Sequence, residues 1–67
     1  MKTWDYLFEF IAGENEGECI FVECEGGILE ANKVISENGF AGQTAYRGRY
    51  TPEEAEILGY DTYWKEG

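Results

Sequence analysis

Aromatic side chains recur at every second position near the start of the chain, and this period constrains the fold more than any other feature. The run consists of Trp4, Tyr6, Phe8 and Phe10. Between them, on the opposite face of an extended chain, fall Asp5, Leu7, Glu9 and Ile11. Because successive strand residues point to opposite faces, whereas a helix repeats every 3.6 residues, this spacing predicts a β-strand within residues 3–12. Aromatic residues also favour strands over helices.

A second strand is predicted over residues 18–25, after the segment 13–17, whose glycines are typical of a hairpin loop. One face of this strand carries Ile20, Val22 and Cys24, and the other carries Cys19, Phe21, Glu23 and Glu25. If the hairpin centres on Asn15, Phe10 lies opposite Ile20 and Phe8 lies opposite Val22. The apolar faces of the two strands then coincide, which supports this pairing.

Residues 28–38 are predicted to form a helix, because the two glycines at 26 and 27 break the preceding strand and a helical period follows. Its apolar stripe consists of Ile28, Ala31, Val34 and Ile35. Gly39 suits the left-handed position after the last turn, and Phe40 can then pack on Ile35 in a Schellman arrangement. The sequence therefore specifies where this helix ends better than where it begins.

A third strand is predicted over residues 43–51, although Gly42 and Gly48 weaken it. A regular strand would place Ala45, Arg47 and Arg49 on one face and Thr44, Tyr46 and Tyr50 on the other. The following helix start is sharp, since Thr51 can cap, Pro52 suits the first helical position and Glu54 completes a capping box. This short helix extends to Leu58 and is stopped by Gly59.

These elements predict a single α+β domain that spans residues 1–67, since a chain of this length has room for one core. The expected architecture is ββαβ, with a three-stranded sheet in the order 2-1-3 and the first strand in the centre. A right-handed crossover places the third strand parallel to the second. The helix at 28–38 covers the face that bears the aromatic rings, and a short helical turn lies near the C-terminus.

The other face of the sheet is more apolar than a water-facing surface requires, because Leu7, Ile11 and Phe21 lie among its acids. Arg47 and Arg49 are expected beside those acids. One interpretation is that the aromatic side chains of the C-terminal segment, Tyr60, Tyr63 and Trp64, fold over the three apolar residues. The alternative is that Leu7, Ile11 and Phe21 form a patch for a protein partner or for a second copy of the chain.

The charge of the chain limits its partners. Fourteen acids against five bases, with no histidine, give a formal net charge of −9. Such a surface repels nucleic acids and anionic membranes, so direct binding to either is not expected, and a partner of the acidic face would be basic. No targeting or membrane-spanning run is present, which predicts a cytoplasmic protein. Cys19 and Cys24 are expected to be reduced thiols, because their odd separation on a strand points them to opposite faces.

No catalytic, cofactor-binding or metal-binding motif is found, and the chain is predicted not to be an enzyme. Without histidine there is no Ser–His or Cys–His nucleophile pair, and Ser36 is the single serine. The loop at 13–17 would repel a phosphate, and its spacing differs from that of a calcium-binding EF-hand loop. A minimal enzyme based on carboxylates would require a pocket lined by at least two acids with raised pKa values.

The sequence thus predicts a small acidic bacterial or phage protein that acts as a protein-interaction module, as a monomer or homodimer. The alternative is an acidic mimic of nucleic acid that inhibits a basic nuclease or DNA-binding protein. Residues two apart on a strand lie about 6.6 Å from each other on one face, so a hairpin can display a row of carboxylates. The residues expected in that row are Glu14, Glu16, Glu18, Glu23 and Glu25.

Overall fold

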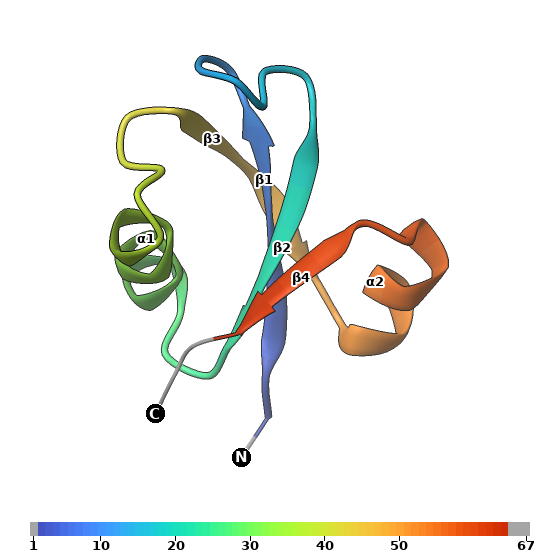
Figure 1. The fold of residues 1–67 in the computed structure, drawn as a ribbon. Coiled ribbons are helices and arrows are strands. Elements are labelled where there is room, and N and C mark those ends of the chain that lie inside the picture. Colours follow the sequence, from blue (N-terminus) through green and yellow to red (C-terminus); the bar gives the residue numbers. More distant parts are fainter. Residues whose placement is uncertain (1, 65–67) are drawn as a thin grey trace.

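A computed structural model describes residues 2–64, apart from the side chains of residues 62–64. Its elements are, in chain order, β1 (Trp4–Phe10), β2 (Cys19–Cys24), α1 (Ile28–Glu37), β3 (Thr44–Tyr50), α2 (Pro52–Leu58) and β4 (Asp61–Trp64). The strands form one sheet in the order β3-β1-β2-β4, with α1 on one face and α2 on the other (Figure 1). The predicted α+β class is confirmed, and so is the placement of β1 between β2 and β3.

The face of the sheet beneath α1 holds the larger core, as the aromatic period predicts. Fully or nearly buried here are Tyr6, Phe8, Phe10, Ile20, Val22 and Cys24 from the sheet and Ala31, Val34 and Ile35 from α1. Trp4, Ile28 and Phe40 pack at its margin. Burying an aromatic or branched side chain contributes roughly 1.5–3 kcal/mol, so this cluster supplies most of the stability of a chain this short.

The hairpin register differs by two residues from the predicted one. Phe8, and not Phe10, lies opposite Ile20, and Tyr6 lies opposite Val22. The loop is centred one residue earlier than Asn15, because the amide of Phe10 donates to the carbonyl of Glu18 at 2.8 Å. A shift by an even number of residues keeps every side chain on its predicted face, so the core is the same.

The helix ends follow the predicted cap chemistry. The amide of Phe40 donates to the carbonyl of Ile35 and that of Gly39 to Ser36, both at 3.0 Å, which is the Schellman pattern. At the start of α2, Thr51 and Glu54 form a reciprocal capping box, with Pro52 in the first turn. The capping box explains why so short a helix as α2 begins where it does.

The last strand was not expected from the sequence. Residues 61–64 form β4, which runs parallel to β2, with Asp61 opposite Ile20 and residue 64 opposite Glu23. The sheet therefore has four strands and not three. No helix in the described part of the chain has the length and apolar character that would carry it across a membrane.

The prediction that Arg47 and Arg49 share a face is wrong, because β3 contains a bulge. The pairing of β1 with β3 shifts between Leu7 and Phe8, where Gly48 adopts a φ of 145°. The bulge reverses the alternation, because one extra residue stands opposite β1. As a result the Arg49 guanidinium lies 4.1 Å from the centre of the Trp4 ring on the α1 side, whereas Arg47 pairs with Glu9 at 2.9 Å.

Gly48→Ala should lower the free energy of unfolding by about 1–3 kcal/mol, because a side chain at this positive φ is strained even where space is open. The neighbouring change Arg47→Ala is the control. It removes a solvent-exposed ion pair and should cost less than about 1 kcal/mol. Urea denaturation of both variants measures the difference, and equal costs would show that the bulge does not require glycine.

Candidate functional site

The second face of the sheet is covered by α2 and by two tyrosine rings. Phe21 is fully buried, and the rings of Tyr50 and Tyr60 lie 5.9 Å and 5.8 Å from its own. Leu7 and Ala55 are buried in the same cluster. Of the three residues expected in a partner patch, Leu7 and Phe21 are therefore enclosed within the chain, and Ile11 alone is exposed, at 52%.

The interpretation that aromatic residues of the C-terminal segment cover this face is supported by Tyr60, which contacts Phe21. The side chains of Tyr63 and Trp64 lie outside the described residues. The helix α2 also contributes to the cover, through Ala55. The sequence predicts α2 but does not indicate which face of the sheet it packs against.

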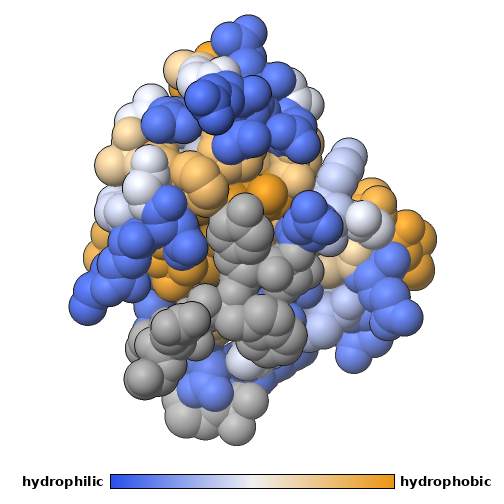
Figure 2. Space-filling view, viewed as in Figure 1, coloured by the Kyte–Doolittle hydropathy of each residue, from blue (hydrophilic) through white to orange (hydrophobic). Residues whose placement is uncertain are grey.

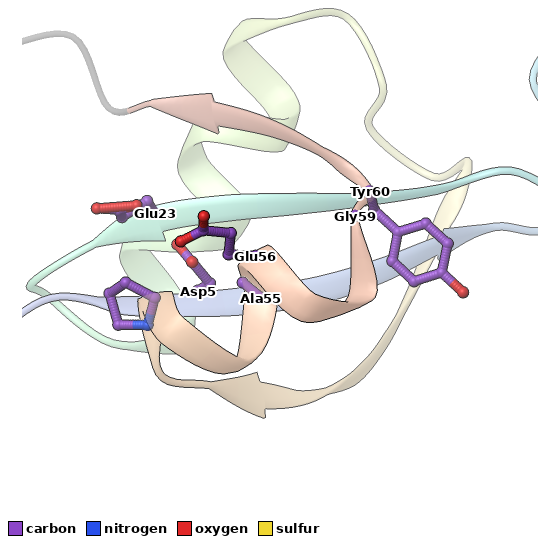
Figure 3. Close-up of a pocket in the computed structure, with 7 residues that line it drawn as sticks. Asp5, Glu23, Ala55, Glu56, Gly59 and Tyr60 are labelled. Carbon is purple, nitrogen blue, oxygen red and sulfur yellow. The ribbon is translucent and has the colours of Figure 1, made fainter.

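A pocket of about 320 Å³ opens beside this cluster, between α2 and strands β1 and β2 (Figure 3). Its lining residues are Asp5, Glu23, Pro52, Ala55, Glu56, Gly59 and Tyr60. Figure 3 shows the carboxyl groups of Asp5, Glu23 and Glu56 gathered at one end, with the Tyr60 ring at the other. The site is thus acidic at one end and has an aromatic ring at the other.

Asp5 is the unusual residue of this pocket. The residue is only 2% exposed, and its Oδ1 atom has no hydrogen-bond partner among the described residues. Burial raises the pKa of Asp5 from 3.8 to about 6, and a hydrogen bond with Glu23 and the negative charges of Glu23 and Glu53 add to the rise. An incompletely satisfied buried carboxyl destabilises a fold, so its presence marks a candidate binding or catalytic site.

The positively charged side chains of the described residues do not line the pocket. Arg47 pairs with Glu9, while Lys2 and Arg49 lie over the Trp4 ring at 4.8 Å and 4.1 Å from its centre. No described lysine or arginine lines the pocket. Within the described part of the chain, no three His, Cys, Asp or Glu side chains are arranged to hold a metal ion. The pocket therefore attracts cations but lacks the ligand geometry of a metal site.

The end of α2 and the residues just after it carry exposed apolar side chains next to acids. Ile57 is 85% exposed, Leu58 45% and Tyr60 44%, and we call these three residues the α2 patch. Glu53 and Glu54 precede Ile57 by four and three residues, so they flank it on the helix surface. Figure 2 shows apolar atoms on the α2 side of the molecule next to hydrophilic ones.

The five glutamates expected to form an acidic row fall into two groups. Glu14, Glu16 and Glu18 are exposed in and beside the hairpin loop. Glu23 is half-buried at the pocket, and Glu25 is exposed just beyond the other end of β2. The length of β2 separates the groups (Figure 1). The fold does not bring the five carboxylates together on one face.

Both cysteines in the described chain are free thiols. Cys24 is buried on the α1 side, and Cys19 is half-buried on the α2 side, so the two lie on opposite faces as predicted. Burial, followed by the nearby Glu30, raises the pKa of the Cys24 thiol. A thiol of this kind is a poor nucleophile.

The sequence did not identify Asp5 as a site residue, although one signal pointed to it. Asp5 and Glu23 share their face with Leu7 and Phe21, whose apolar character called for a cover. Asp5 lies opposite Glu23 in the ladder, and Leu7 lies opposite Phe21. An element that covers the apolar pair therefore also lies over the neighbouring acidic pair. That inference requires knowledge of where α2 packs.

Comparison with models of known families, with curated proteins and with solved structures found no match for this chain. The fold and the site themselves define a small acidic α+β domain with a pocket that contains a buried carboxyl group.

Proposed function

We propose that this chain is a non-enzymatic protein-binding domain whose α2 patch binds a basic protein. The observation that carries the proposal is the exposure of Ile57 at 85% and of Leu58 at 45% at the end of α2, and of Tyr60 at 44% just after it. Adjacent exposed apolar residues with a polar rim are typical of interaction surfaces. The core does not need Ile57, since Ala55 provides the buried contact of α2.

Charge complementarity specifies the class of partner. Glu53, Glu54, Glu56 and Asp61 are all exposed on or just after α2. A partner that offers an apolar residue surrounded by lysine or arginine satisfies both parts of this surface. Electrostatic attraction would then speed association and weaken as salt rises. The free thiols agree with a cytoplasmic location, because a reducing compartment keeps cysteines unpaired.

The double substitution Ile57→Ser and Leu58→Ser should abolish capture of the partner without unfolding the domain, because both side chains are exposed. The immobilised wild type and the double variant are compared in capture from host lysate at two salt concentrations. Leu29→Ser is the matched control, since Leu29 is 81% exposed on the other helix. The proposal predicts a basic protein that the wild type and the control retain at low salt.

Retention of the same proteins by the double variant would contradict this function. A variant with Glu14, Glu16 and Glu18 changed to Gln tests nucleic-acid mimicry separately. If that variant alone loses a nuclease or DNA-binding protein, the acidic hairpin is the binding surface and the α2 patch is not.

A further inference from the structure

The pocket beside α2 has features that the proposed function does not use. Asp5 lines a space of about 320 Å³, although the residue is almost completely buried, and its Oδ1 atom has no hydrogen-bond partner among the described residues. The buried strands and helices of a folded chain satisfy nearly all their polar atoms, so an exception of this kind calls for an explanation. The simplest is a ligand that donates a hydrogen bond to this oxygen.

We propose that this pocket binds a guanidinium group, supplied by an arginine side chain of the protein partner. That the arginine comes from a protein partner rests on the function proposed above. That the pocket binds guanidinium does not. Three carboxyl groups, from Asp5, Glu23 and Glu56, line the site without a described basic residue. Its ligand is therefore a cation that donates hydrogen bonds.

The lining of the site favours guanidinium over ammonium. Guanidinium is planar and directs five N–H donors outward, so one group can reach the Asp5 oxygen and a neighbouring carboxylate together. It is also more weakly hydrated than ammonium, which lowers the cost of entering a half-buried pocket. Pro52, Ala55 and Tyr60 provide apolar surface along which the aliphatic part of an arginine can lie.

The position of the pocket agrees with a partner's side chain as the source. Glu56 lines the pocket and adjoins Ile57 of the α2 patch along the helix, and Tyr60 belongs to both. A partner seated on the α2 patch therefore adjoins the rim of the pocket. The volume of the pocket is at the lower end of the roughly 300–1,000 Å³ typical of small-molecule sites, which suits one side chain.

Titration with methylguanidinium, followed by NMR, tests the chemistry of the pocket without any partner. We expect saturable shifts at Asp5, Glu23 and Glu56, with a dissociation constant of about 1–10 mM at low salt. Tetramethylammonium carries the same charge but no donors, and should give no saturable shift. Equal responses to the two cations, or no response to methylguanidinium, would overturn the proposal.

Two variants connect these shifts to the acids. Asp5→Asn and Glu56→Gln should each weaken methylguanidinium binding about tenfold, because each removes a charge-assisted hydrogen bond. Glu37→Gln, an exposed acid of α1, makes the same change in net charge and should leave the dissociation constant unchanged. Unchanged binding by Asp5→Asn would show that the shifts come from general attraction of cations to an acidic surface.

A last comparison separates this proposal from the function on which it rests. The variant Ile57→Ser, Leu58→Ser should lose the partner yet keep the affinity for methylguanidinium. Asp5→Asn should instead weaken methylguanidinium binding about tenfold and partner capture at least tenfold. If Asp5→Asn captures the partner as the wild type does, the guanidinium does not come from the partner and the proposal is wrong in that respect. Loss of capture by the α2 variant alone would still support the protein-binding function.

Discussion

Phe21→Ala should leave the domain largely unfolded at 25 °C. The Phe21 side chain is fully buried between the sheet and α2, with the rings of Tyr50 and Tyr60 against it. Truncating a buried phenylalanine costs about 3–5 kcal/mol, and a core of this size rarely supplies more than about that amount. The α1 side of the sheet cannot compensate, because both faces belong to the same two central strands, β1 and β2.

Circular dichroism and the dispersion of amide NMR signals measure this outcome. Ile57→Ala is the control, since Ile57 is 85% exposed on the same helix and its truncation should change the stability by less than about 0.5 kcal/mol. A Phe21→Ala variant that stays within about 1 kcal/mol of the wild type would show that α2 is not packed against the second face of the sheet.

Asp5→Asn should stabilise the domain at neutral pH by up to about 3 kcal/mol. The folded state raises the pKa of Asp5 from 3.8 to about 6, chiefly through burial. The folded state therefore binds the proton more tightly than the unfolded chain, and the free energy of unfolding falls as pH rises between about 4 and 6. Each tenfold difference in proton affinity corresponds to about 1.4 kcal/mol, which gives the magnitude.

The difference in the free energy of unfolding between wild type and Asp5→Asn should thus be near zero at pH 3, grow between pH 4 and 6, and stay constant above pH 7. Urea denaturation at these pH values measures it. Glu37→Gln changes the net charge equally and should show no such growth. A neutral-pH stability of Asp5→Asn at or below that of the wild type would mean that the buried carboxyl does not destabilise the fold.

The expected effects of Asp5→Asn on stability and on guanidinium binding describe a compromise between the two properties. The substitution that stabilises the domain, Asp5→Asn, is also expected to weaken guanidinium binding about tenfold. A carboxyl group held in an apolar surrounding lowers the free energy of unfolding, yet it provides the acceptor that a cation needs. Leu at this position would suit a purely structural role better, because it would pack with Leu7 and Phe21 without an unsatisfied oxygen.

Patterns among neighbouring residues predicted the strands and helix ends that are determined locally. The aromatic alternation from Trp4 to Phe10 specified one strand and its buried face, and Gly39 with Phe40 specified the end of α1. The order of β1, β2 and β3 followed from these faces and from the handedness of crossovers. Each of these features is determined by residues close in sequence, or by a period that only one fold satisfies.

The remaining features depend on where distant segments meet. The strand β4 pairs with β2 across some forty residues, and four residues are too few to show a period. The bulge at Gly48 reverses the faces of β3, and a glycine alone does not reveal whether a strand bulges or ends. From the sequence alone, Asp5 is expected to face solvent, and only the position of α2 shows that it is buried. The candidate site was therefore not predictable from the sequence, although its acids were visible there.

The most direct test of this account is the pKa of Asp5 itself, measured by NMR from its side-chain carboxyl carbon. We predict a midpoint near pH 6, and a lower midpoint when methylguanidinium is present, because a bound cation stabilises the charged form. A midpoint near pH 4 that does not respond to methylguanidinium would contradict both the enclosure of Asp5 beneath α2 and its role as an acceptor.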